Sequence, residues 1–188
     1  MGAQHKSEHP KHGRLDWFGK ARSRAFVKQG PDLQRAPKLA LLVGTWFYTG
    51  LSPVASGTVG SAAAALIYYG VPALHSNVAL LLASAVVLLV GTWSGEILER
   101  ALETPDPGIV VIDEVLGQWL ALLTFSYAGD VRFLILAFLF FRAFDILKPA
   151  PARYFERRPG GLGIMLDDAV AGLYAAIAAN LVMYVLTR

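Results

Sequence analysis

Five acidic residues lie inside, or at the ends of, apolar segments long enough for membrane helices: Asp113, Glu114, Asp145, Asp167 and Asp168. Inserting one charged side chain into a bilayer core costs about 2.5–3.5 kcal/mol. A single such acid could be a helix N-terminal carboxylate stabilised by the helix dipole. Five of them on one membrane face instead need a cation, so we expect all five to be ligands of a membrane-embedded metal site. Oxygen ligands and the absence of cysteine favour Mg²⁺, with Mn²⁺ as the alternative.

Basic residues flank the third of these acids, Asp145. Arg142, Asp145 and Lys148 are spaced i, i+3, i+6, which places them along one helical face. This stripe could be an internal ion-pair ladder. Alternatively, Arg142 orients Asp145 while Lys148 binds a phosphate as a point charge, and Arg153 in the following loop contributes a forked contact. In that case Asp145, Asp113 and Lys148 are the expected catalytic residues.

Two glycine-rich turns precede expected helices, at residues 56–61 and 160–163. In the first turn, free backbone amides together with the Thr58 and Ser61 hydroxyls could face an anion. The second turn precedes the Asp167-Asp168 pair and permits close backbone approach or a hinge. Each signal is weak alone, since glycine is common before helices.

The composition indicates a membrane protein. The chain is 55% hydrophobic and 16% charged, and residues 39–95 contain no Asp, Glu, Lys or Arg. One crossing needs about 20 residues. We expect an all-α membrane bundle, with an interfacial or re-entrant helix in residues 37–50 and about five spans. The expected spans are 58–71, 77–95, 109–127, 131–147 and 166–186.

The distribution of basic residues sets the expected topology. Residues 1–38 carry nine Lys and Arg against three acids, and residues 148–163 are also basic. Placing both segments in the cytoplasm satisfies the positive-inside rule and brings all five acids to the cytoplasmic half of the membrane. Residues 1–36 are interpreted as a disordered tail that contacts anionic lipid, and residues 37–188 as the functional domain. The tail lacks the interleaved aromatics of a nucleic-acid surface.

Four segments occur in the order of a known family: LSPVASGTVGS (51–61), PGIVVIDEVLGQW (107–119), FRAFDILKP (141–149) and GLGIMLDD (161–168). With them, the chain from about residue 38 to its end resembles phosphatidylglycerophosphatase A. The resemblance implies a Mg²⁺-dependent phosphatase in the bacterial inner membrane. Its substrate would be phosphatidylglycerophosphate, which it converts to phosphatidylglycerol.

Taken together, these observations predict hydrolysis of a lipid phosphomonoester at the cytoplasmic membrane face. Direct attack by water is favoured slightly over an aspartyl-phosphate intermediate, since the Asp-x-Asp-x-Thr pattern is absent. The alternative is a small divalent-cation transporter or channel subunit with the acids lining its path. Acids confined to one membrane half argue against that alternative. Membrane lipid is the expected environment, and the sequence leaves the oligomeric state open.

Overall fold

The computed structural model describes residues 33–156 and 158–188, and all regular structure within them is helical. Most of the predicted basic tail, residues 1–36, therefore lies outside the described residues. Three short turns, η1 (Leu33–Arg35), η2 (Thr49–Leu51) and η3 (Pro72–His75), connect or precede the helices. The α-helices are α1 (Lys38–Gly44), α2 (Ser56–Gly70), α3 (Asn77–Leu102), α4 (Ile112–Ala121), α5 (Val131–Leu147), α6 (Ala152–Glu156) and α7 (Gly161–Leu186).

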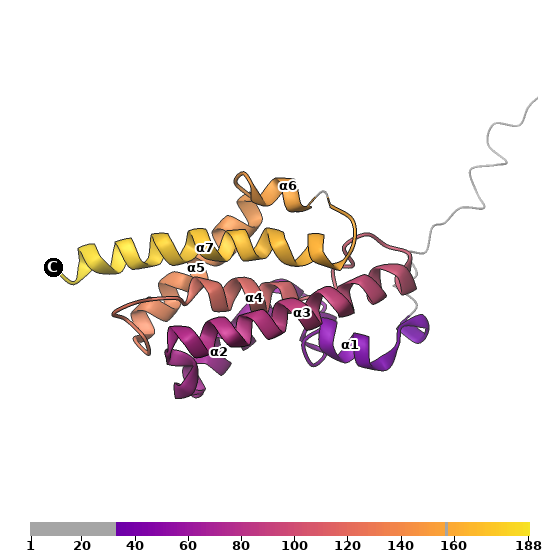
Figure 1. Ribbon diagram of the computed structural model, residues 1–188, viewed down its shortest axis with the longest axis horizontal. Helices are drawn as coiled ribbons and strands as arrows, with labels where there is room; N and C mark the ends of the chain where they lie inside the picture. The colour runs from indigo at the N-terminus through magenta and orange to yellow at the C-terminus, as the bar shows by residue number, and fades with distance from the viewer. Residues whose placement is uncertain (1–32, 157) are drawn as a thin grey trace, which may run out of the picture. The chain divides into compact units, whose positions relative to one another are not determined.

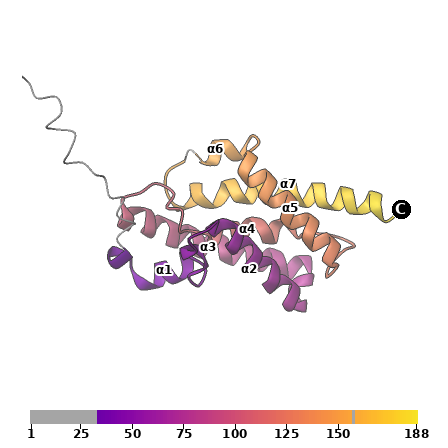
Figure 2. The ribbon, with the colours of Figure 1, turned by 180° about the vertical axis from the view of Figure 1, so that it is seen from behind.

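The short helix α4 lies at the centre of the bundle. It packs against α2, α3, α5 and α7, and Figures 1 and 2 show it between α7 on one side and α2 and α3 on the other. Most of its side chains are buried, including the polar Asp113 and Gln118. The Trp119 indole Nε1 donates a hydrogen bond to the carbonyl oxygen of Ala64 on α2, at 3.1 Å. The first acid pair of the sequence is thus carried by the most enclosed helix.

Glycines allow the helices that carry the acids to touch through their backbones. A Cβ added at Gly172 of α7 would lie 2.3 Å from the carbonyl oxygen of Gly117 on α4. A Cβ at Gly161 would lie 1.9 Å from the carbonyl oxygen of Thr92 on α3. Small residues have this function in membrane helix packing, where close backbone approach replaces the hydrophobic driving force.

Two of the five predicted crossings are helices of membrane length. α3 and α7 each have 26 residues and are apolar enough to span a bilayer. α2 and α5 match the predicted positions but have 15 and 17 residues. The predicted third span, 109–127, is wrong as a continuous helix: α4 has 10 residues, about 15 Å, roughly half of a bilayer core.

Side-chain hydrogen bonds explain why α4 ends where it does. Asn77 Oδ1 accepts from the backbone N–H of Thr124, and Asn180 Nδ2 donates to the carbonyl oxygen of Leu123. Thr124 Oγ1 in turn donates to Asn180 Oδ1 at 2.7 Å. These bonds satisfy backbone groups that a longer helix would have paired internally. The pattern of apolar residues in the sequence could not show that these side chains bind backbone groups which a longer helix would need.

Two predicted connections are partly helical. α3 continues to Leu102, seven residues beyond the expected span 77–95, and the connection between the expected spans 131–147 and 166–186 contains α6 and the start of α7. The extension of α3 has a structural consequence. Glu96 Oε2 accepts from the N–H of Gly161, and Glu99 Oε2 accepts from the N–H of Gly160, at 2.9 and 3.0 Å. Two glutamates of α3 therefore satisfy backbone donors at the N-terminus of α7.

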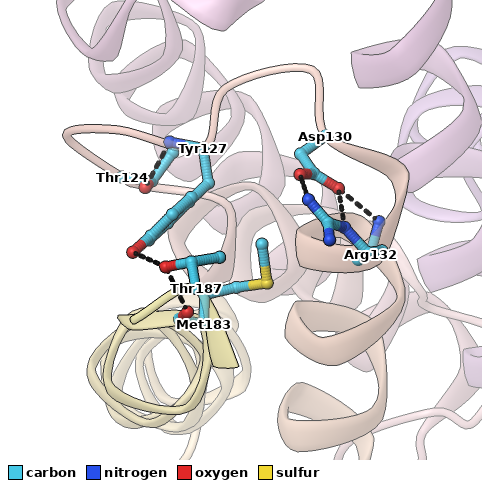
Figure 3. Close-up of polar contacts among 6 residues, drawn as sticks. All are labelled: Thr124, Tyr127, Asp130, Arg132, Met183 and Thr187. Atoms are coloured by element: carbon cyan, nitrogen blue, oxygen red, sulfur yellow. Dashed lines mark hydrogen bonds and ion pairs between the residues drawn. The ribbon is translucent and has the colours of Figure 1, made fainter. Parts of the chain in front are cut away.

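At its other end, α7 contacts the α4–α5 turn (Figure 3). Tyr127 Oη lies 3.3 Å from Thr187 Oγ1, which donates to the carbonyl oxygen of Met183. In the same turn, Asp130 caps α5 and accepts hydrogen bonds from both the backbone and the guanidinium of Arg132. These bonds hold the pKa of Asp130 at about 2. Both ends of α7 are thus fixed by polar contacts.

The Gly117–Gly172 contact gives a first prediction. Gly172→Ala forces α4 and α7 apart, and overpacking of this kind costs about 1–3 kcal/mol. We expect a lower thermal unfolding midpoint in detergent and a loss of the function carried by the acids. The matched control is Gly70→Ala, since a Cβ at Gly70 meets nothing within 4 Å. Equal unfolding midpoints for the two variants would contradict the close contact.

Candidate metal and phosphate site

Three carboxylates from two helices converge. Asp113 and Glu114 lie in the first turn of α4, and Asp168 lies about two turns into α7. One carboxylate oxygen from each can be chosen so that all three lie within 4.8 Å of one another. The sequence predicted that these acids would share one site, and the structure brings them together.

Asp145 joins this group from the C-terminal end of α5. Its side chain is within hydrogen-bonding reach of Asp168. Its Oδ2 is also 2.7 Å from Arg142 Nη1, one turn earlier on the same helix. The same Arg142 nitrogen lies 3.4 Å from Ser61 Oγ on α2. Arg142 therefore orients Asp145, as the spacing in the sequence suggested, and connects it to α2.

Asp167 has a different environment from its neighbour Asp168. Its Oδ2 accepts a hydrogen bond from Lys148 Nζ at 2.8 Å, and it is not one of the three convergent carboxylates. Lys148 follows α5 directly in a left-handed conformation, with φ of 44°. Asp167 therefore holds the positively charged ammonium group of Lys148 at the edge of the carboxylate cluster. The ligand role predicted for Asp167 stays a prediction, since only its Oδ2 atom is bound by Lys148 and its Oδ1 atom is buried without a hydrogen-bond partner among the described residues.

The predicted phosphate-binding residues are distributed unevenly. Ser61 is buried and donates to the carbonyl oxygen of Gly57 at 2.7 Å, which orients it toward Arg142. Thr58 is exposed on the first turn of α2, and Arg153 is exposed on α6. The structure thus places Arg142 and Ser61 next to Asp145 and Lys148 next to Asp167, while the role predicted for the exposed Thr58 and Arg153 stays a prediction.

Gly57 contributes to the site through its missing side chain. A Cβ at this position would lie 2.1 Å from Glu114 Oε1 and 3.3 Å from Arg142 Nη1. The glycine-rich segment 56–61 was predicted to be a turn before a helix that faces an anion. In the structure it forms the first turns of α2, and the group against it is the Glu114 carboxylate. Any larger residue would displace Glu114 from the cluster.

Burial makes this arrangement electrostatically demanding. Asp113 and Asp168 are 9% and 3% exposed, and the side chains of Asp113 and Glu114 also contact each other. Two like charges 4 Å apart repel by about 4 kcal/mol at an effective dielectric constant of 20. Asp113 Oδ1 and Glu114 Oε2 are buried without a hydrogen-bond partner among the described residues. Buried, crowded oxygen donors of this kind fit a hard divalent cation such as Mg²⁺.

The sequence analysis missed Asp106. Its charge acts on both Asp113 and Asp167, so it lies close to the cluster. It adopts a left-handed conformation, with φ of 43°, in the α3–α4 connection. Its signal in the sequence was the run Pro-Asp-Pro-Gly, which indicates a turn and says nothing about what the carboxylate contacts.

An aromatic and basic edge borders the site on α6 and the segment after it. Arg158 Nη2 donates to Tyr154 Oη at 3.0 Å, and its guanidinium lies over the Tyr154 ring, 5.1 Å from the centroid. This hydrogen bond lowers the pKa of the Tyr154 phenol. Both residues are exposed, as expected for groups at a polar–apolar boundary.

The fold and the site define a class of all-helical proteins whose buried carboxylates lie beside an arginine and a lysine. Residues 42–183 match the sequence profile of one such family, phosphatidylglycerophosphatase A. The chain belongs to the phosphatidylglycerophosphatase A family. Both the recognition from the four motifs and the expectation of an enzyme are thereby confirmed.

Two curated relatives carry the name of this family, and a third carries another name. Phosphatidylglycerophosphatase A of Escherichia coli is 36% identical over 139 residues, covering 72% of this chain and 78% of the relative. The Haemophilus influenzae protein of the same name is 33% identical over 144 residues, covering 76% and 88%. A Bacteroides thetaiotaomicron protein provisionally named phosphatidylinositol-3-phosphatase is 36% identical over 160 residues, covering 82% and 99%. No solved structure matches the chain.

The crowded carboxylates give a second prediction. In wild type, saturating Mg²⁺ should raise the thermal unfolding midpoint, because a ligand at about 100 times its Kd stabilises the folded state by about 2.7 kcal/mol. Asp113→Asn and Asp168→Asn should abolish this rise while leaving the midpoint without Mg²⁺ unchanged or higher, since a repulsion is removed. Asp130→Asn, at the α4–α5 turn, keeps its helix cap and serves as the control. A full Mg²⁺ response in Asp113→Asn would contradict the site.

Proposed function

We propose that this protein is a Mg²⁺-dependent phosphatase that hydrolyses the terminal phosphomonoester of phosphatidylglycerophosphate at the cytoplasmic face of a bacterial membrane. The observation that carries the proposal is the convergence of Asp113, Glu114 and Asp168 beside Arg142 and Lys148. The family and the names of two relatives support the substrate. The transporter alternative is dropped, because the family is one of phosphatases.

The surface of the bundle supports a location in the membrane. Large apolar side chains are exposed along α3, α5 and α7, among them Leu89 at 70%, Ile146 at 73% and Ile177 at 68%. A water-soluble protein rarely exposes contiguous apolar surface on this scale. The excess of Lys and Arg in residues 1–38 supports a cytoplasmic N-terminus.

The carboxylates would hold the cation and the basic residues would hold the phosphate. Asp113, Glu114 and Asp168 are the proposed ligands, and Asp145 lies next to them. When bound, Mg²⁺ supplies positive charge that offsets the charge of the transferring phosphoryl group. Lys148, oriented by Asp167, contributes a second positive charge at the edge of the cluster. Positioning and charge of this kind dominate catalysis of phosphoryl transfer.

Water is the proposed nucleophile. Arg142 holds Asp145 Oδ2, which orients this carboxylate as the residue that accepts a proton from the attacking water. The new bond joins the water oxygen to phosphorus, and the bond that breaks joins phosphorus to the headgroup oxygen, which takes a proton from solvent and leaves as a hydroxyl. The absence of the Asp-x-Asp-x-Thr pattern supports water over a carboxylate as the nucleophile.

A second lipid is suggested by one comparison. The Bacteroides thetaiotaomicron relative, provisionally named for phosphatidylinositol 3-phosphate, is matched over nearly its whole length. Both lipids present a phosphomonoester on a polyol headgroup, so the carboxylate cluster alone does not distinguish them.

The third prediction tests the function directly. Purified protein in mixed micelles should release phosphate from phosphatidylglycerophosphate when Mg²⁺ is present, and a chelator should stop the release. Asp168→Asn should lower the rate by at least about 100-fold, the cost of losing one strong electrostatic contact to the transition state. Hydrolysis confined to soluble phosphomonoesters would rule out the lipid assignment.

The fourth prediction compares the contributions of Lys148 and Arg153 to catalysis. Lys148→Met removes the cation at the cluster and should lower kcat/KM by about 100-fold or more. Arg153→Gln changes an exposed residue on α6 and should alter kcat/KM by less than about 3-fold, as expected for a weak surface contact. Steady-state kinetics on the same lipid substrate compare the two. An equal loss of kcat/KM in the two variants would show that Arg153 also acts at the site.

A further inference from the structure

Three consecutive residues between α1 and η2 have a backbone conformation that is rare for residues with large side chains. Trp46, Phe47 and Tyr48 have φ of 46°, 55° and 69°, all in the left-handed region. Residues with a Cβ are strained there, and when the region is occupied it is by single residues rather than by runs. Strain of this kind persists only where surrounding contacts hold it, and it is concentrated at functional sites.

Thr45 holds the strained turn from inside. Its side chain is fully buried, and its hydroxyl donates to the carbonyl oxygen of Leu41 at 2.7 Å. The same hydroxyl oxygen accepts from the backbone N–H of Tyr48 at 3.0 Å. The carbonyl oxygen of Thr45 accepts from the N–H of Gly50 at 2.9 Å. One residue thus binds the end of α1, the last left-handed residue and the residue where the turn closes.

The side chains of the turn do not explain its conformation. Phe47 and Tyr48 are 65% and 50% exposed. Only Trp46 packs against the acid-bearing helix, with its ring edge-on to Trp119 of α4 and 6.0 Å between centroids. The reason for the conformation therefore lies in what the backbone of the turn contacts.

The backbone of the turn contacts the segment that leads into α4. The N–H of Val111 donates to the carbonyl oxygen of Gly44, the last residue of α1, at 2.9 Å. A Cβ added at Gly50 would lie 2.0 Å from the carbonyl oxygen of Ile109. The left-handed path thus reverses the chain so that residues at both of its ends, 44 and 50, lie against residues 109–111.

The position of this segment decides where two of the convergent carboxylates lie. Asp113 and Glu114 are in the first turn of α4, directly after Val111 and Ile112. The N–H groups of a first helical turn have no carbonyl partner within the helix, so contacts from outside must hold that turn. Val111 is the fully buried N-cap residue of α4. A displacement of Val111 would therefore move both carboxylates relative to Asp168.

We propose that the turn of residues 45–50 positions the metal site, and that Thr45 is the positioning residue. Thr45 acts through Val111: it holds the turn, the turn holds the N-cap of α4, and the N-cap sets the direction of the Asp113 and Glu114 side chains. The proposal rests on the proposed function, since it takes these two carboxylates as Mg²⁺ ligands. Groups that orient metal ligands from outside the coordination shell typically change metal affinity by about 10–100-fold when they are removed.

Two substitutions of Tyr48 test the backbone conformation. Both remove the same exposed ring, but glycine adopts a positive φ readily, whereas the branched Cβ of valine disfavours it. Tyr48→Gly should keep the Mg²⁺ affinity of wild type, and Tyr48→Val should weaken it by about 10-fold or more. Isothermal titration calorimetry with MgCl₂ on the purified full chain measures both. Equal affinities for the two variants would overturn the proposal.

Substitutions of Thr45 test the positioning residue. Thr45→Val keeps the shape and loses the hydroxyl, and should weaken Mg²⁺ binding by about 10-fold or more, whereas Thr45→Ser keeps the hydroxyl and should bind nearly as wild type. The control is Thr92→Val on α3, which removes a hydroxyl bond of the same kind, to the carbonyl oxygen of Leu88 at 2.7 Å. If Thr45→Val and Thr92→Val lower the unfolding midpoint alike and neither changes Mg²⁺ affinity, Thr45 has a structural role only and the proposal is wrong.

Hydrogen exchange at the Val111 amide tests the contact without Mg²⁺ or substrate. This amide should be protected in wild type, Thr45→Ser and Tyr48→Gly, and should exchange faster in Thr45→Val and Tyr48→Val. If Thr45→Val does not fold, the Tyr48 pair gives the same comparison. Equal exchange rates in all folded variants would overturn the positioning role. A wild type that binds Mg²⁺ without hydrolysing phosphatidylglycerophosphate would reject the proposed function and leave the positioning role intact.

Discussion

Mutual repulsion among buried carboxylates is the constraint on which the rest of this structure depends. Asp113, Glu114, Asp145 and Asp168 come from three helices and meet in an interior where water screens little. Such a group is stable only if the helices cannot move apart and if positive charge is supplied at fixed positions. The glycine contacts between α4 and α7 and between α3 and α7 meet the first requirement. Arg142 and Lys148 meet part of the second, and the remainder is what a divalent cation would provide.

The sequence predicted the identity of the acids and their convergence, because charged residues are rare in apolar segments and the spacing of Arg142 and Asp145 is local to one helix. It did not predict how the acids divide their roles. Asp167 and Asp168 are neighbours in the chain, but helical geometry turns adjacent side chains about 100° apart, so one faces Lys148 and the other faces the cluster. The environment of each was decided by tertiary packing.

The fold was predictable in class and less so in detail. Apolar length located α2, α3, α5 and α7 well, since each is a continuous run bounded by turn residues. It failed at α4, where Asn77, Thr124 and Asn180 hold the chain in a non-helical course after Leu122. These three polar residues are far apart in sequence, so no local pattern could reveal their contact. Asp106 was missed for the same reason, because its role depends on what the fold places opposite its turn.

The two glutamates of α3 that bind the Gly160 and Gly161 amides also affect the electrostatic environment of the acid pair on α7. A helix offers partial positive charge at its N-terminus, and that benefit fades within the first turn. Here it is taken up by Glu96 and Glu99, while Asp167 and Asp168 sit further along the axis. The aspartates thus gain almost nothing from the helix that carries them. Lys148 compensates the charge of Asp167, and the charge of Asp168 is left for a bound cation to neutralise.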